Sequence, residues 1–189
     1  MYEEILNHIQ REIDLDQTEK EEFTSLLFEK RLSKKDLLIQ PGQQVEAEYY
    51  VVKGCLQAYY LSESGDKHII QFAIEDWWIS DFEAFFKDEP ASLYLEAIED
   101  SYLLGINKEV LEPLYKRIPK FERFFRIKTT NAFVALRSRI LSSLQKTAKE
   151  RYLDFCETYP KIESRVPNYN IANYLGIKPE SLSRIRREL

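Results

Sequence analysis

The C-terminal end of the chain, residues 168–189, reads NYNIANYLGIKPESLSRIRREL. Its apolar residues recur at helical spacing, which predicts a short helix over residues 168–175. The inward face of this helix comprises Ile171, Ala172 and Leu175. Gly176 follows, and glycine readily adopts the left-handed conformation that ends many helices. The sequence therefore predicts a sharp turn after the first helix.

A second helix is expected to open at Lys178-Pro179-Glu180, because proline at the first helical position sacrifices no hydrogen bond. The residues that point inward are Leu182, Ile185 and Leu189. The exposed face is left with Glu180, Ser181, Arg184 and Arg187. Two short helices joined by a glycine turn are typical of the helix-turn-helix, whose second helix fits the major groove of DNA. The alternative is an ordinary corner between two helices with a solvated face.

Charge is distributed unevenly along the chain, although the net charge is only −5. Residues 116–189 hold 17 Lys and Arg against 7 Asp and Glu, whereas residues 1–115 hold 10 against 25. The two parts therefore suit different partners, and the basic part suits a polyanion such as DNA. The alternative is that both sets of charges lie on solvated faces.

Residues 121–145 contain neither proline nor glycine and predict a helix far longer than average. At 100° per residue its apolar side chains form two stripes. One stripe comprises Phe124, Ile127, Val134 and Leu141; the other comprises Phe125, Ala132, Phe133, Leu136, Ile140 and Leu144. Basic residues border the stripes: Lys128, Arg139 and Lys146 on one side and Arg123, Arg126 and Arg137 on the other.

One stripe can cover the β region of its own chain, and the other then needs a second partner. A twofold copy of the chain is the simplest such partner, which predicts a homodimer. The expected dimer contacts are Phe124, Ile127, Val134, Leu136, Ile140, Leu141 and Leu144. The alternative is that the second stripe packs on the N-terminal helices.

Between residues 36 and 107 the apolar period is that of strands, whereas residues 3–30 and those after about 108 read as helical. Short β-branched and aromatic runs end at turn residues, a pattern typical of an all-β sandwich or barrel. The expected strands include residues 37–39, 49–52, 56–61, 68–74, 92–97 and 101–106.

The composition, with 44% hydrophobic and 31% charged residues, is that of an ordinary globular protein. No apolar run approaches the ~18 residues that span a bilayer, and the acidic start lacks the features of a secretory signal, so we expect a cytoplasmic protein without a membrane partner. His8 and His68 are the only histidines and Cys55 and Cys156 the only cysteines. We therefore expect no metal site, no cofactor and no enzyme.

The segment Ile171 to Arg186 closely resembles the helix-turn-helix of the Crp/Fnr family of bacterial transcription regulators. The family pattern is I-A-x-x-L-G-[IV]-[ST]-x-E-[ST]-[LV]-S-R, and Lys178 is the one departure from it. The resemblance covers nearly the whole chain and implies an α+β fold. In that fold, N-terminal helices and an antiparallel β-roll, similar to a cyclic-nucleotide-binding jelly-roll, are expected to form a sensor (1–115). A dimerisation helix (116–146) and a helix-turn-helix domain (147–189) are expected to follow.

The resemblance carries residue roles over by position. Glu180 and Arg184 match the base-reading pair, and Ser181 matches a hydroxyl that contacts phosphate. Pro179 stands where several members have a third base-reading arginine, so the preferred operator should differ. The expected DNA-binding residues are Asn168, Lys178, Pro179, Glu180, Ser181, Ser183, Arg184 and Arg187.

Members that bind cyclic AMP hold its ribose and phosphate with a G-E-L segment and a following R-S. The matching stretches here are Ser80-Asp81-Phe82 and Ala91-Ser92, so alanine replaces the phosphate-binding arginine. A cyclic phosphate in a partly buried pocket needs that arginine, and cyclic AMP is therefore not expected to bind in the usual way. The expected, degenerate effector pocket comprises Ser80, Asp81, Phe82, Ala91, Ser92, Leu136 and Arg137.

An apolar ligand is a further possibility, because aromatic residues are dense between positions 59 and 86, although such residues usually form a core. They are Tyr59, Tyr60, Phe72, Trp77, Trp78, Phe82, Phe85 and Phe86. His68 is expected at the surface or packed rather than as a haem ligand. The effector, if there is one, is not named by the sequence.

The expected function is that of a dimeric, sequence-specific transcription regulator that binds double-stranded DNA, with RNA polymerase as a further candidate partner. The alternative is a sensor module that regulates a protein partner through its C-terminal helices. The family's DNA-binding module is usually followed by a β-hairpin wing, whereas this sequence stops at Leu189. Weaker DNA binding is then expected, unless residues 162–167 take over the role of the wing.

Overall fold

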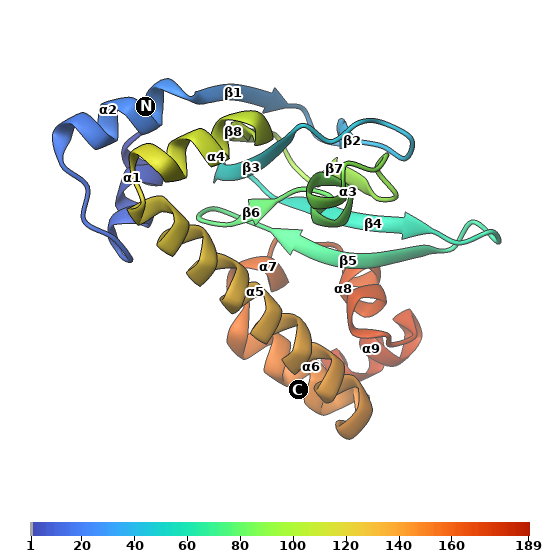
Figure 1. The fold of residues 1–189 in the computed structure, drawn as a ribbon. Helices are drawn as coiled ribbons and strands as arrows, with labels where there is room; N and C mark the ends of the chain where they lie inside the picture. The colour runs from blue at the N-terminus through green and yellow to red at the C-terminus, as the bar shows by residue number, and fades with distance from the viewer. Residues whose placement is uncertain (1) are drawn as a thin grey trace.

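The structure is a computed structural model that describes residues 2–189 as a β-roll, a long helix and a C-terminal helical module (Figure 1). The helices are α1 (Glu3–Gln10), α2 (Gln17–Ser25), α3 (Phe82–Lys87), α4 (Lys108–Arg117), α5 (Lys120–Gln145), α6 (Ala148–Thr158), α7 (Pro160–Glu163), α8 (Asn168–Leu175) and α9 (Pro179–Arg187). The strands are β1 (Leu27–Leu32), β2 (Leu37–Ile39), β3 (Ala47–Lys53), β4 (Leu56–Leu61), β5 (Lys67–Ala73), β6 (Trp78–Ile79), β7 (Tyr94–Ala97) and β8 (Ser101–Asn107). The expected α+β fold is confirmed.

Two four-stranded antiparallel sheets form the β-roll. Their strand orders are β1-β8-β3-β6 and β2-β7-β4-β5. The core of the roll includes the fully buried side chains of Tyr50, Leu56, Phe85, Leu95 and Leu103. Helices α1, α2 and α4 gather at one end of the roll (Figure 1). This end also receives the start of α5, where Phe121 stacks on Phe23 with 4.6 Å between the ring centroids.

The N-terminal stretch differs from the helical expectation for residues 3–30, because residues 27–30 belong to β1. Strand β1 pairs with β8, far along the chain, and this pairing overrides the local helical spacing. Phe28 lies opposite Gly105, where a Cβ atom would be 2.3 Å from the phenyl ring. The close approach therefore requires glycine. Strand β6 and helix α3 were also missed, because each is too short to show a period.

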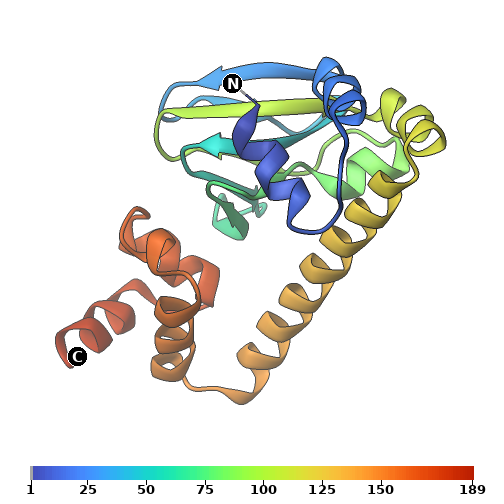
Figure 2. The ribbon, with the colours of Figure 1, turned by 90° about the vertical axis from the view of Figure 1, so that its left-hand side faces the viewer.

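The fully buried side chains of the long helix α5 all lie in its first third. Phe121, Phe124 and Phe125 are buried there, and the helix then runs away from the roll (Figure 2). The expectation that one stripe covers the β region is therefore wrong in detail, because Phe124 and Phe125 come from different stripes. Among residues 2–189, no helix combines the length and apolar character needed to cross a membrane.

An ion pair inside an aromatic enclosure holds α5 to the β-roll. The Lys128 Nζ lies 2.6 Å from Oε2 of Glu48 on β3, and the Glu48 side chain is only 2% exposed. The same ammonium lies 4.2 Å from the ring centroid of Trp78 and 4.4 Å from that of Phe125. Burial lowers the pKa of Lys128, and the Glu48 carboxylate opposes that shift. Lys128, read from the sequence as a border residue, thus points into its own chain.

The C-terminal module turns back beneath the β-roll and shares a hydrophobic core with it (Figure 2). The module contributes Tyr152, Phe155, Ile162, Val166, Ile171, Ala172, Ile177, Leu182 and Ile185 to this shared core. The outer side of the sheet β2-β7-β4-β5 contributes Tyr59, Ile69 and Phe72, and the adjoining loops add Cys55 and Ile74. The module is therefore packed against the sheet through a common core, and is not joined to the roll by the chain alone.

A guanidinium adds a polar contact to this docking. Arg165 donates hydrogen bonds of 2.7 and 3.0 Å to the Glu75 carboxylate, and it also pairs with Glu99. Glu75 further accepts the N–H of Gly54 at 2.9 Å. Burial by itself would raise the pKa of Glu75, but the hydrogen bonds from Arg165 and Gly54 outweigh burial and lower that pKa to about 2.

We expect Lys128→Met to lower the free energy of unfolding by about 3–5 kcal/mol, because it leaves the buried Glu48 carboxylate without its partner. Removing both charges, in Lys128→Met with Glu48→Gln, should restore most of the loss. Urea denaturation of the three proteins measures this difference. A double variant as unstable as Lys128→Met would contradict the role given to the unpaired carboxylate.

The Glu75 contact should lose its stabilising effect in acid. The pKa of Glu75 in the folded chain lies below the ordinary value of 4.5, so its contribution is fully present above that value and disappears as the pH falls towards 2. The difference in unfolding free energy between the wild type and Glu75→Gln should accordingly be constant above about pH 5 and shrink between pH 4.5 and 2. Denaturant melts along a pH series test this; a difference that grows in acid would refute it.

Candidate nucleic-acid interface and effector pocket

The two C-terminal helices adopt the predicted turn. Helix α8 ends at Leu175, Gly176 has a left-handed φ of +63°, and α9 begins with Pro179 at its first position. Leu182 and Ile185 are buried, as expected. Leu189 is instead 65% exposed, because α9 ends at Arg187 and the next helical turn is not formed.

One face of α9 carries a row of exposed polar groups. Glu180, Ser183, Arg184 and Arg187 lie three or four residues apart and are all exposed. Lys178 and Pro179 are exposed at the start of the helix, whereas Ser181 is half-buried beside this row. We call this set of positions the reading face. It comprises Lys178, Pro179, Glu180, Ser181, Ser183, Arg184 and Arg187.

Arg186 makes its contacts within the C-terminal module and is not part of the reading face. Its guanidinium lies 3.0 Å from Glu163 and also donates to the side chain of Asn168. Asn168 is exposed, but its amide oxygen is engaged by that arginine. Within the described part of the chain, Lys178, Arg184 and Arg187 form no ion pair, so their charges face solvent.

The segment 162–167 does not form a hairpin. It comprises the end of α7 and a turn, and the side chains of Ile162 and Val166 are buried in the shared core. Its role is thus to hold the module together.

The stretch that matches the nucleotide-binding segment is closed by its own hydrogen bonds. Asp81, 1% exposed, accepts the N–H groups of Ser92 at 2.8 Å and Leu93 at 3.0 Å. It also accepts the Ser92 hydroxyl at 3.3 Å and the Ala84 N–H at 3.4 Å. A carboxylate offers about four acceptor positions. The carboxylate that would hold a ribose is therefore already occupied by the chain itself.

The remaining residues of the expected effector pocket do not all meet there. Ser80 is buried and donates to the Ala47 carbonyl at 2.9 Å, and Ala91 is buried nearby in the roll. Leu136 and Arg137 are exposed on the far part of α5. The α5 side chain that approaches Phe82 is instead that of Lys128, 5.8 Å from the ring centroid.

The eight aromatic residues considered for an apolar pocket belong to different environments. Trp78 and Phe85 lie in the core of the roll, Tyr59 and Phe72 lie in the shared core, and Phe86 is 62% exposed. His68 is exposed and stacks on Tyr60, in agreement with a surface position. These aromatic side chains are thus distributed over two cores and the surface rather than gathered around one site.

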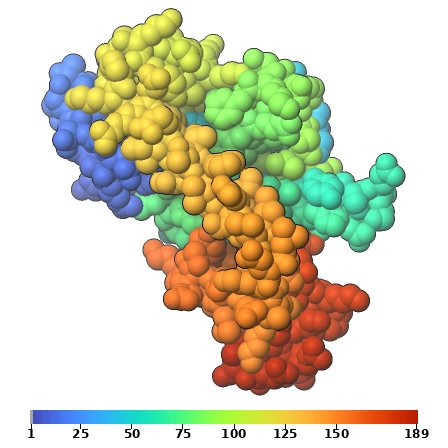
Figure 3. All heavy atoms as spheres, turned by 60° about the horizontal axis from the view of Figure 1, so that its bottom comes forward, coloured from blue at the N-terminus to red at the C-terminus, as the bar shows by residue number. Residues whose placement is uncertain are grey.

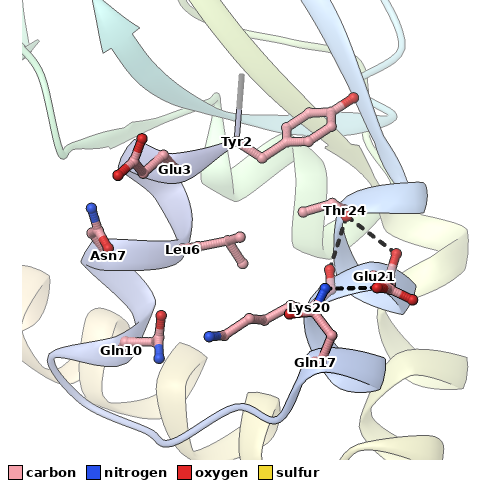
Figure 4. Close-up of a pocket in the computed structure, with 9 residues that line it drawn as sticks. All are labelled: Tyr2, Glu3, Leu6, Asn7, Gln10, Gln17, Lys20, Glu21 and Thr24. Atoms are coloured by element: carbon pink, nitrogen blue, oxygen red, sulfur yellow. Dashed lines mark hydrogen bonds between the residues drawn. The ribbon is translucent and has the colours of Figure 1, made fainter.

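A shallow hollow lies elsewhere, between α1 and α2 (Figure 4). Its lining includes Tyr2, Leu6, Gln10, Lys20 and Thr24. None of the residues expected in the effector pocket lines this hollow.

The far part of α5 lies on the surface of the chain (Figure 3). Its large exposed apolar side chains are Phe133, Val134, Leu136, Ile140, Leu141 and Leu144. Of the expected dimer contacts, Phe124 is only 2% exposed and Ile127 is half-buried, so Phe124 packs within its own chain. Both stripes, rather than one, are open beyond residue 128.

Two charged residues of α5 were misassigned from the sequence. Lys128 and Arg139, read as stripe borders, are eleven residues apart and therefore lie on nearly the same face of the helix. Both point towards the chain itself, Lys128 to Glu48 and Arg139 to carbonyl groups of β5 and α8. Their common face with Phe121 and Phe124 was the signal that could have identified them.

Known proteins match the β-roll and, in longer alignments, most of the chain. Residues 29–118 match the cyclic nucleotide-binding domain family. The chain is 24% identical over 183 residues to the fumarate and nitrate reduction regulatory protein of Vibrio cholerae serotype O1, covering 90% of this chain and 72% of that protein. It is also 24% identical to the cAMP-activated global transcriptional regulator CRP of Salmonella typhimurium, covering 82% of this chain and 79% of that protein.

A solved structure has the same fold. The structure of FixK2 from Bradyrhizobium japonicum is similar with a TM-score of 0.71 at 21% identity, covering 86% of this chain and 84% of that one. The segment Ile171 to Arg186 departs from the Crp/Fnr pattern only at Lys178. The β-roll, the long helix and the helix-turn-helix follow one another in the same chain, which is thus similar over most of its length to regulators of the Crp/Fnr family.

Proposed function

We propose that two copies of this chain bind double-stranded DNA through α9 and act as a sequence-specific transcription regulator. The observation that carries the proposal is the reading face, which stays exposed while the opposite side of the module is buried. Arg184 is placed to pair with guanine in the major groove and Glu180 to accept from cytosine N4. Lys178, Ser181, Ser183, Arg187 and Asn168 are proposed phosphate or groove contacts.

Dimerisation is proposed through the far part of α5. Six large apolar side chains exposed on one helix are unusual for an isolated chain and suit a second copy of the same helix. Two parallel copies would present the two α9 helices to half-sites about one DNA turn apart, roughly 34 Å.

The β-roll lacks the arginine with which relatives of this type hold cyclic AMP. We infer that cyclic AMP does not bind in the usual way, because Ala91 replaces the phosphate-binding arginine and Asp81 is saturated by Ser92 and Leu93. The activation by cAMP named for the Salmonella relative therefore does not carry over to this chain. Since its proposed ligand is chromosomal DNA, the protein would act in the cytoplasm, beside RNA polymerase as a candidate partner.

Arg184→Ala should weaken binding to a selected operator by about 1–3 kcal/mol and relax the base preference at one position of each half-site. Arg187→Ala should instead weaken all duplexes about equally and lower the salt dependence by about one charge per subunit. Operator selection from random duplexes, followed by anisotropy titrations at several salt concentrations, measures both effects. An unchanged operator profile for Arg184→Ala would remove it as a base reader. Binding to DNA phosphates must weaken as the salt concentration rises. A duplex affinity that does not change with salt would therefore favour the alternative, in which the C-terminal helices bind a protein partner.

Ile140→Asp should weaken self-association about a hundredfold, because a charge would enter an apolar contact made twice in the dimer. Sedimentation velocity over a range of concentrations measures the association. Phe86→Asp is the matched control, since Phe86 is similarly exposed but lies on α3, outside the far part of α5 that carries the proposed contact. Equal association of the two variants would contradict dimerisation through α5.

A further inference from the structure

Strand β5 is the edge of its sheet and contains a bulge. Tyr59 of β4 pairs with Ile69 and Ala58 pairs with Gln71, so Ile70 is the extra residue. A bulge places Ile69 and Phe72 on the same outer face, and both enter the shared core. An edge strand also presents backbone N–H and C=O groups that no neighbouring strand satisfies.

Asn173 of α8 satisfies part of this edge. Its amide oxygen accepts the Ile69 N–H at 2.7 Å, and its amide nitrogen donates to the Lys67 carbonyl. One side chain thus bonds the C=O of one residue and the N–H of the residue two further on. A neighbouring parallel strand would make the same pair of bonds. The helix is attached to the sheet edge in a fixed register.

Arg139 of α5 satisfies the bulge itself. Its guanidinium donates to the carbonyls of Ile70 at 2.6 Å and Ile69 at 3.1 Å, and to the Tyr174 carbonyl at 2.9 Å. The guanidinium also lies 4.0 Å from the ring centroid of Tyr174. One side chain from the long helix therefore joins β5 of the roll to the end of α8.

We propose that Asn173 and Arg139 are positioning residues that fix the direction of α9 relative to α5, and so set the half-site spacing that a dimer accepts. This inference rests on the proposed DNA-binding function. The three elements that meet here belong to the roll, the long helix and the module. Helix α8 leads through Gly176 directly into α9, so its orientation is passed on to the reading face.

The contacts position the reading face without covering it. Asn173 and Tyr174 are half-buried on the side of α8 that faces the sheet, whereas Glu180, Arg184 and Arg187 are exposed. The docked arrangement is thus one in which the reading face is available to DNA.

The test uses the chain of residues 1–189 and two substitutions that conserve charge, Asn173→Ala and Arg139→Lys. A lysine ammonium lacks the planar fork that reaches three carbonyls at once. The probes are duplexes with two copies of the half-site selected by the wild type, whose separation is varied in single base-pair steps. We expect the affinity ratio between the preferred and neighbouring separations to fall about tenfold in both variants, as the loss of two or more hydrogen bonds allows. Base preference within each half-site should not change.

Arg126→Lys is the matched control, because Arg126 is exposed on α5 and should keep the wild-type spacing preference. Hydrogen exchange provides an independent measurement: the Ile69 amide should exchange faster in Asn173→Ala, while that of Leu182 in α9 should not, which shows that the module stays folded. An unchanged spacing preference in both variants, tighter binding by either, or an unchanged Ile69 exchange rate would overturn the proposal. A wild type that binds no duplex would overturn the proposed function itself.

Discussion

The sheet β2-β7-β4-β5 has two apolar faces, and this constraint determines where the C-terminal module lies. Strand β4 buries Leu56 and Ala58 in the roll and Gln57 and Tyr59 on the other side. A sheet of this kind must be covered on both faces. The C-terminal module covers the second face, so the side of the module that is buried is the side that fits this sheet. The reading face lies on the opposite side of the module. Its direction is therefore set by the apolar residues of a sheet that does not itself contact DNA.

The uneven charge of the chain serves ion pairs within the molecule as well as the proposed binding of DNA. Lys128 pairs with Glu48 and Arg165 with Glu75 and Glu99, so basic residues of the second part meet acidic residues of the first. The reading-face cations stay outside these pairs. A surplus of 17 against 7 charges therefore overstates the charge that is open to a polyanion.

The sequence predicts correctly those elements whose formation depends on residues close together in the chain. The bounds of α8, the turn at Gly176 and the strand β4 agree with expectation, because cap, turn and period lie within a few residues of one another. Contacts between residues far apart in the chain are not predicted by such local patterns. The pairing that makes β1 a strand depends on Gly105, and the saturation of Asp81 depends on the path of the chain back to Ser92. The period of α5 shows apolar residues on both sides, so it marks Arg139 as pointing inward only when its face is compared with that of Phe121 and Phe124.

The two attachments of α5 make the roll the element that controls the others. Lys128 joins the first part of the helix to β3, and Arg139 joins its far part to β5 and α8. Strands β3 and β5 lie in different sheets, so a change in the packing between the sheets must shift one attachment relative to the other. Such a shift would tilt α5 and carry α8 with it, because packed elements move as units rather than deform. A signal in the roll would therefore reach α9 through a change in sheet packing, without any ligand at the DNA-binding module.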